Sequence, residues 1–233
     1  MPAKNSRKLY LENGFYHIYN RGVEKRIIFQ DEQDYSVFLS YLKEYLLPKN
    51  ESELMNKLSN PLLSYKEKAE IIRLINLNNF AGEISLLAYC LMANHFHLLI
   101  KQNSANSIDS FMNSLGTRYT MFFNRKNKRV GHLYQGEYKA VLVETDEQLL
   151  HLSRYIHSQA LASKGHAFRG WAEKEDQPSS FPEYLGLRNT KWINTSEISN
   201  FFSKNKQFYP SSYEAFVRQN ESFEYISKFR IED

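Results

Sequence analysis

The sequence contains a single cysteine, Cys90, among its 233 residues. One cysteine excludes an intramolecular disulfide and is typical of a chain that works in a reducing compartment. The N-terminal stretch is basic but has no apolar core like that of a secretory signal, and no run of about 18 apolar residues follows it. These absences predict a cytoplasmic protein with no membrane partner.

Glycine and proline are also scarce, at 9 and 6 residues, and no internal repeat or low-complexity tract is present. Hydrophobic residues make up 42% of the chain and charged residues 24%, which is the balance of a soluble globular protein. The net charge of +4 permits a polyanionic partner without requiring one. Most of the 16 tyrosines and 16 phenylalanines belong in a core, although some could stack on nucleic-acid bases.

The stretch from 86 to 102, LLAYCLMANHFHLLIKQ, holds two apolar runs on either side of a short break at 92–94. Apolar runs without alternation are typical of central strands that are covered on both faces. Because side chains alternate along a strand, His95 and His97 share one face. They are either two hydrogen-bonded strand histidines or part of a metal site, and a metal site needs a third ligand from elsewhere in the chain.

The segment before these strands predicts a strand, a helix and an insertion. The aromatic and β-branched run 15–20 predicts a first strand, and the amphipathic spacing of 31–47 predicts a helix. The polar segment at about 49–79 predicts a helical insertion, with helix-start signals at Asn60 and again at Ser64.

The segments after the insertion predict two paired strands over 83–92 and 95–102, a long helix capped by Ser107, a strand over 134–143 and a helix from 146 to about 163. The whole order is that of an α+β ferredoxin-like sandwich. We expect an antiparallel sheet with helices on one face and one added helix. Residues 1–163 then form one domain, and 164–233 form a C-terminal extension packed on it, with short helices over 195–202 and 211–220.

The added helix carries polar residues beside its apolar stripe. His151, Tyr155 and Gln159 follow one another at four-residue steps, so they lie over one another at a spacing of roughly 6 Å, whereas His157 points elsewhere. Tyr155 is either an ordinary aromatic of a helix face or a group that this helix brings to the two histidines.

Basic residues gather on one face and at the end of the long helix. This cluster comprises Arg118, Arg125, Lys126, Lys128 and Arg129. It is either a solvated face or a surface that contacts phosphates. Arg21, just after the first predicted strand, and Lys139, within the predicted strand 134–143, are further candidates for contact with nucleic acid.

Five blocks of the sequence, in order, resemble the HUH single-tyrosine transposases, especially their REP-associated branch. The blocks are YHIYNRG at 16–22, IFQDEQDYSVFL at 28–39, LMANHFHLLI at 91–100, LYQGEYKAVLVE at 133–144 and SRYIHSQ at 153–159. A sixth, SSFPEYLG at 179–186, is similar to the trailing block of longer members.

The resemblance implies that His95 and His97 are metal ligands, that Tyr155 is the nucleophile and that Gln159 is a third ligand. Ala93 stands where the family usually has proline, which alters the rigidity of the turn. Ser158 and Gln159 replace the Leu and Asn common in the REP-associated branch, and Gln159 instead resembles the insertion-sequence type. The implied cofactor is Mg²⁺ or Mn²⁺, because imidazole-rich ligation suits Mn²⁺ and availability favours Mg²⁺.

The implied activity is cleavage and rejoining of single-stranded or hairpin DNA through a covalent phosphotyrosine, with His151 as a possible base for Tyr155. Two other functions remain open at the level of the sequence. One is a domesticated DNA-binding module without turnover, and the other is a metallohydrolase that uses bound water and does not need Tyr155. The protein could act as a monomer or as a homodimer.

Overall fold

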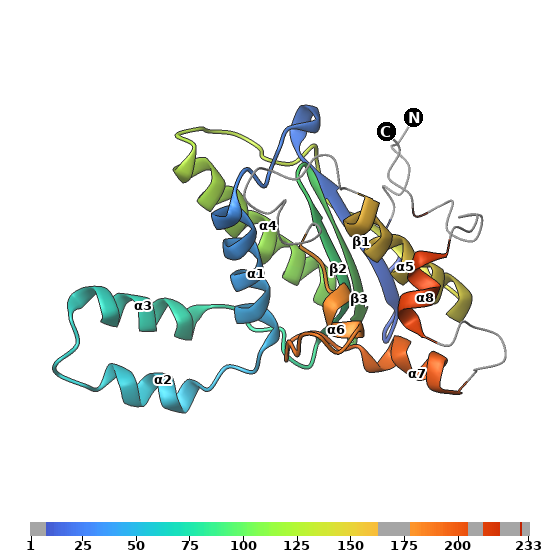
Figure 1. The fold of residues 1–233 in the computed structure, drawn as a ribbon. Coiled ribbons are helices and arrows are strands. Elements are labelled where there is room, and N and C mark those ends of the chain that lie inside the picture. The colour runs from blue at the N-terminus through green and yellow to red at the C-terminus, as the bar shows by residue number, and fades with distance from the viewer. Residues whose placement is uncertain (1–7, 163–177, 205–211, 220–228, 230–233) are drawn as a thin grey trace.

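The computed structural model describes residues 8–162, 178–204, 212–219 and 229 (Figure 1). Its four strands are β1 (Phe15–Arg21), β2 (Ile84–Met92), β3 (His95–Gln102) and β4 (Lys139–Val143). They form one antiparallel sheet in the order β2-β3-β1-β4. With α1 (Glu32–Leu46) after β1 and α4 (Ser107–Lys126) after β3, this connectivity confirms the predicted ferredoxin-like sandwich.

Helices α1 and α4 cover one face of the sheet (Figure 1). Asp31 caps α1 by accepting a hydrogen bond from the backbone N–H of Asp34. The apolar stripe of α1 then meets every second residue of the central strands, as the contact between Phe38 and Phe96 illustrates with ring centroids 5.4 Å apart. The predicted cap of α4 is off by one residue, because Asn106 holds the cap position and the Ser107 hydroxyl donates to Glu83.

Helix α5 (Asp146–Ala162) covers the opposite face, so the expectation that all the helices share one face is wrong (Figure 1). The physical reason lies in the strands, which are apolar on both sides. Leu99 and Val141 point away from α1 and α4 and pack with Leu152 and Ile156 of α5. A sheet with two apolar faces needs a layer on each of them.

The C-terminal extension packs against β2 and α5 through α6 (Phe181–Tyr184), α7 (Ser196–Lys204) and α8 (Tyr213–Arg218). Backbone hydrogen bonds run from Leu91 N to Pro178 O, from Ser180 N to Tyr89 O and from Asn194 N to Leu86 O. The cap of α8 is Ser212, whereas Ser211, where the predicted helix 211–220 begins, lies outside the described residues.

The predicted insertion is a helical hairpin that projects from the rest of the molecule (Figure 1). Its helices are α2 (Glu51–Leu58) and α3 (Tyr65–Asn76). The start signal at Ser64 is confirmed, because Ser64 and Glu67 form a capping box at the start of α3. The start signal at Asn60 is wrong, because α2 begins earlier, with Asn50 as its cap, and Asn60 lies in the turn between the two helices.

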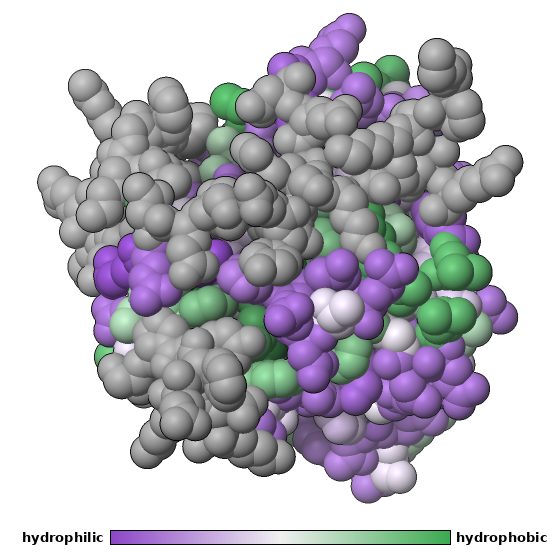
Figure 2. Space-filling model, turned by 90° about the vertical axis from the view of Figure 1, so that its right-hand side faces the viewer, coloured by the Kyte–Doolittle hydropathy of each residue, from purple (hydrophilic) through white to green (hydrophobic). Residues whose placement is uncertain are grey.

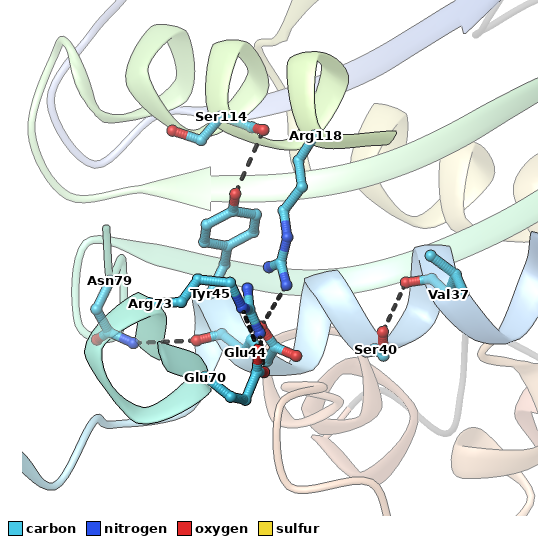
Figure 3. A network of polar contacts seen from close by, with 9 residues as sticks. All are labelled: Val37, Ser40, Glu44, Tyr45, Glu70, Arg73, Asn79, Ser114 and Arg118. Atoms are coloured by element: carbon cyan, nitrogen blue, oxygen red, sulfur yellow. Dashed lines mark hydrogen bonds and ion pairs between the residues drawn. The ribbon is translucent and has the colours of Figure 1, made fainter. Parts of the chain in front are cut away.

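An ion-pair network fastens this hairpin to α1 and α4 (Figure 3). Glu44 of α1 accepts Arg118 of α4 at 2.7 Å and pairs with Arg73 of α3 at 3.6 Å. Glu70 completes the network by binding Arg73. The guanidinium of Arg118 also lies 3.7 Å from the centre of the Tyr41 ring. Arg118 therefore takes part in holding the insertion to the domain.

The fourth strand is shorter than the predicted 134–143. It begins at Lys139, while Tyr134 forms only an isolated bridge to Gly22. Gly22 is required at this position, because a Cβ atom would lie 2.2 Å from the backbone oxygen of Arg26. Its N–H donates to Asn94 O, and both Ile28 and Phe29 donate to Ala93 O, so the segment after β1 holds the turn between β2 and β3.

Among the described residues, no helix is both long enough and apolar enough to cross a bilayer.

Candidate active site

His95 and His97 lie on the face of the sheet that α5 covers. Their ring centroids are 5.0 Å apart and the ring planes are nearly perpendicular. Phe96, between them, packs on the other face against α1, as strand alternation requires. His97 is fully buried, whereas His95 is partly exposed and its Nδ1 lies 2.6 Å from Asn94 Oδ1. The two imidazoles therefore meet at the end of β3, one inside the molecule and one toward solvent.

A third histidine, His17 of β1, completes this group. His17 is fully buried, and its Nε2 lies 2.8 Å from Nδ1 of His97. The two ring planes are nearly parallel, with centroids 5.1 Å apart. Tyr19 follows on the same face of β1 and is the registered partner of His97, with ring centroids 6.4 Å apart. One imidazole nitrogen of His97 is thus already bound by a neighbouring strand.

Tyr155 of α5 contacts the same histidines from the helix that covers this face of the sheet. It is 6% exposed, and its ring lies edge-on to His97 at 5.5 Å and to His17 at 6.4 Å between centroids. Four residues further along α5, Gln159 is half-buried and lies one turn beyond Tyr155. A phenol and an amide are therefore carried by one helix, and the phenol packs directly on a buried imidazole of the same chain.

Burial keeps the inner imidazoles uncharged. It lowers the pKa of His17 to about 3. Burial also lowers the pKa of His97 well below its ordinary value, and nearby positive charge, with Arg21 among its sources, lowers it further. Neutral imidazole is the form that can ligate a metal ion.

The polar atoms of this group fit a divalent metal ion. His97 Nε2 is buried and makes no hydrogen bond within the described part of the chain, a state that costs free energy unless a ligand meets it. In the same described residues, no three His, Cys, Asp or Glu side chains are grouped as a metal site. Within the described residues, a third protein ligand beside His95 and His97 would have to be of another residue type, and the amide oxygen of Gln159 is chemically suitable.

His151 contacts the C-terminal extension and the next turn of α5. Its Nδ1 lies 2.8 Å from Nη2 of Arg154, and its ring is 5.7 Å from that of Phe216 in α8. His157 points toward the same extension, with Nδ1 2.7 Å from Tyr213 Oη and Nε2 2.8 Å from Ser180 Oγ. Burial lowers the pKa of His157 to about 3. These two histidines bracket Tyr155 in sequence, and their contacts join α5 to the extension.

The predicted DNA-binding residues fall into two groups. Arg21 pairs with His95 across β1 and β3, and Lys139 pairs with Tyr19, which in turn pairs with His97, so both cations belong to the histidine face. The α5 side of the molecule, viewed in Figure 2, presents hydrophilic surface beside apolar patches. Arg21 and Lys139 are the predicted cations that the strand register brings next to the site.

The basic residues of α4 lie across the sheet from the histidines. Arg118 is engaged by Glu44, and Lys126 lies 2.7 Å from Asp31 and 2.6 Å from Asp34. Arg129 donates to Asn124 Oδ1 and to His132 O. Arg125 is in the last turn of α4, and Lys128 follows the cap residue Asn127. The carboxylates that Arg118 and Lys126 contact reduce the positive charge that this cluster offers to phosphates.

His17 and Tyr19 were not among the residues predicted for the site. The signal was present, because FYHIYN places a histidine in an apolar strand, as the sequence around His95 and His97 does. What the sequence could not supply was the register of β1 against β3, which brings together residues about 80 positions apart.

Comparisons with known proteins agree with the resemblance predicted above. Residues 54–159 match the family described as "Transposase IS200 like". No curated protein matches the chain. Among solved structures, a REP-associated tyrosine transposase bound to a REP hairpin is 9% identical, with a TM-score of 0.45 and coverage of 81% of this chain and 95% of that one. A candidate transposase from Deinococcus radiodurans R1 is 13% identical, with a TM-score of 0.34 and coverage of 68% and 98%.

The matched segment contains β2, β3, α4, β4 and most of α5, and with them His95, His97, Tyr155 and Gln159. Over this segment the chain is similar to the IS200-like transposases, which confirms the family resemblance predicted from its sequence.

Proposed function

We propose that this protein is a metal-dependent transposase that cleaves and rejoins single-stranded DNA through a covalent bond to Tyr155. The observation that carries the proposal is the packing of the Tyr155 ring on His97, whose buried Nε2 makes no hydrogen bond among the described residues. A nucleophile and a vacant ligand atom in direct proximity are the parts that such a reaction requires.

His95, His97 and Gln159 would hold the ion, Mg²⁺ or Mn²⁺. When bound, such an ion supplies positive charge that polarises a phosphate oxygen. The protein's own contribution is positional. His95 and His97 are fixed by adjacent positions on one strand face, and Gln159 is carried by the helix that carries Tyr155, so the position of the ion and the position of the nucleophile depend on each other.

The reaction assigned to Tyr155 is an in-line displacement at phosphorus. Its phenolic oxygen forms a bond to the phosphorus atom, the bond from phosphorus to the 3′ oxygen breaks, and the released strand end becomes a 3′-hydroxyl by taking up a proton. The phosphotyrosine keeps the free energy of the broken bond for rejoining, so no nucleotide triphosphate is consumed.

The proton of Tyr155 must leave before or during attack, because an unperturbed phenol has a pKa near 10. His151, one turn earlier on α5, is our candidate base. Its contacts with Arg154 and Phe216 orient it toward the extension, so a bound water between His151 and Tyr155 would be needed for this role.

The proposed substrate is single-stranded or hairpin-forming DNA. Arg21 and Lys139, on the site's own face of the sheet, would contact its phosphates next to the point of cleavage. Arg125, Lys128 and Arg129 would contact the strand further away, and Arg118 and Lys126, which are both paired with carboxylates, contribute least.

Trapping of a protein–DNA adduct tests the proposal. The unaltered chain, incubated with hairpin-bearing single strands and Mn²⁺, should give a covalent adduct on a denaturing gel and a free 3′-hydroxyl. Tyr155→Phe should keep Mn²⁺ and DNA binding but give neither product. Cleavage without an adduct would favour a water-using metallohydrolase, and DNA binding without cleavage in the unaltered chain would favour a silent binding module; either result overturns the proposal.

A further inference from the structure

His17 is a buried group that the proposed reaction does not use. It lies on β1, outside the matched segment 54–159, and contributes no atom to the ligand set of His95, His97 and Gln159. Its nearest polar neighbour is nevertheless a ligand residue, because His17 Nε2 lies 2.8 Å from His97 Nδ1. Both side chains are fully buried, so no bulk water competes for this contact.

Only one proton can lie between these two nitrogens when both rings are neutral, and its position decides what His97 can do. If His17 Nε2 carries the proton, His97 must hold its own proton on Nε2 and cannot use that atom to bind a metal. If His97 Nδ1 carries it, His97 Nε2 keeps its lone pair and is ready to ligate. The same contact therefore either blocks the site or prepares it.

We propose that His17 is a positioning residue that accepts a hydrogen bond from His97 Nδ1–H and thereby fixes His97 in the tautomer and orientation that present Nε2 to the metal ion. The inference rests on the proposed function, since it concerns how one ligand of that site is prepared. Metal-bound histidines commonly donate their second ring N–H to an acceptor that sets their orientation.

The ring geometry supports the hydrogen bond itself, and the surroundings of His17 support its direction. The near-parallel rings, with an interplanar angle of 10°, keep the shared hydrogen bond close to both ring planes. The second nitrogen of His17, Nδ1, makes no hydrogen bond of ordinary geometry in the described residues, and the pKa of His17, which burial lowers, is raised in part by a backbone hydrogen bond with Phe229. An acceptor on that side favours a proton on His17 Nδ1, which leaves His17 Nε2 free to accept from His97.

The rigidity of the arrangement comes from the sheet. His17 pairs with Leu99 on β3 and with Val141 on β4, so it is held from both sides by backbone ladders. His97 is two registered positions away from that pair, on the same face of the sheet. A side chain that is fixed in this way can orient its neighbour without any movement of its own when a metal ion arrives.

The tautomer can be measured directly in the unaltered protein. Long-range ¹H–¹⁵N spectra of the metal-free chain at neutral pH should assign the proton of His97 to Nδ1 and that of His17 also to Nδ1. A His97 protonated on Nε2 would overturn the inference, and this measurement needs no variant that could fail to fold.

Metal affinity provides the second readout, through titration with Mn²⁺ followed by electron paramagnetic resonance. We expect His17→Phe, which keeps an aromatic ring but no acceptor, to weaken Mn²⁺ binding roughly 10- to 100-fold, the usual effect of losing such a partner. His17→Gln, whose amide oxygen can accept the same hydrogen bond, should recover part of the affinity. Val141→Ala, which truncates the registered neighbour of His17, should leave the affinity within about twofold, because it reduces the packing beside His17 but removes no hydrogen bond.

The outcomes separate this inference from the proposed function. Mn²⁺ binding that requires His97 but is equal in the unaltered chain and in folded His17→Phe would overturn the inference alone. Mn²⁺ binding that survives His97→Ala would overturn the proposed metal site, and the inference with it. Loss in His17→Phe, partial recovery in His17→Gln and no loss in Val141→Ala would support both.

Discussion

The two faces of the sheet bury different kinds of side chain. Toward α1 and α4 the interior is almost entirely apolar, with Phe29, Phe38, Phe96 and Tyr119 packed ring against ring. Toward α5 the interior includes many polar side chains that are as deeply buried. They are His17, His97, Ser153, Arg154, His157 and Ser180.

This difference shows which face the protein uses for chemistry and which for stability. A buried polar group costs free energy unless each of its polar atoms has a partner, so an apolar residue of the same size is the better choice where only packing matters. The α1 and α4 face follows that rule. The α5 face departs from it around Tyr155, as expected where local packing is given up for a functional site.

The largest expected effect comes from the ligands of the α5 face. His97→Ala should reduce cleavage by more than the roughly 100-fold that an outer partner is worth, at ordinary Mn²⁺ concentration. Gln159→Ala should cost roughly 10-fold and should partly recover at high metal, because a water can replace one amide ligand. Cleavage rates across a Mn²⁺ titration check both predictions. Similar losses in the two variants would contradict the smaller contribution assigned to Gln159.

On the opposite face, a substitution should lower the stability of the fold and leave metal binding unchanged. Phe38→Ala removes a ring in contact with Phe29, Phe96 and Tyr119 and should lower the free energy of unfolding by about 3–5 kcal/mol. Urea denaturation measures this loss. Mn²⁺ affinity per folded molecule should stay unchanged, and an affinity loss as large as that of His97→Ala would remove the distinction between the faces.

The buried histidines of the α5 face should also make stability depend on pH. In the folded chain His157 is neutral, because burial lowers its pKa to about 3, whereas in the unfolded chain it takes up a proton below pH ~6.5. The unfolded state therefore binds more protons in this window, so stability is full above pH ~6.5 and falls as the pH drops toward 3.

His157→Gln isolates that contribution. Between pH 7.5 and pH 5, the substitution should remove about 2 kcal/mol of the pH-dependent loss of stability. Urea unfolding at the two pH values gives the comparison, with Phe38→Ala as a control that should lower stability equally at both. An unchanged pH dependence in His157→Gln would mean that His157 is charged in the folded protein.

The smallest expected effect concerns the cations. Lys139→Ala should lower the slope of log affinity against log salt by about one for single-stranded DNA, whereas Arg118→Ala should leave the slope nearly unchanged, because Glu44 already engages Arg118. Fluorescence anisotropy across a salt series measures the two slopes. A larger change for Arg118→Ala would place the DNA on the α4 side of the sheet.

Much of the fold could be predicted because its signals are local. The run 15–20, the acids that open α1 and the apolar runs around His95 each specify an element within a few residues, and the strand order follows from the connectivity rules. The start of β4 could not be predicted, because Tyr134 to Tyr138 looks like strand but Gln135 N donates to Arg21 O and Tyr134 bridges Gly22 in a separate contact.

Some features of the candidate site likewise follow from local sequence patterns, whereas others depend on the packing of distant segments. The shared face of His95 and His97 follows from alternation along one strand, and the stacking of Tyr155 over Gln159 follows from one helix. The place of His17 beside His97 depends on how two distant strands register. The pairing of Arg118 with Glu44 likewise depends on the packing of α4 on α1, which no local pattern encodes.

The C-terminal extension lies along β2, and this position has a consequence for self-association. An outer strand presents unpaired backbone groups that can template the addition of a foreign strand, a common route to aggregation. On β2 the groups of Leu86, Tyr89 and Leu91 already bond to Asn194, Ser180 and Pro178 of the same chain. The extension therefore hinders the addition of a foreign strand to β2. The other outer strand is β4, where another chain could add a strand without first displacing these contacts.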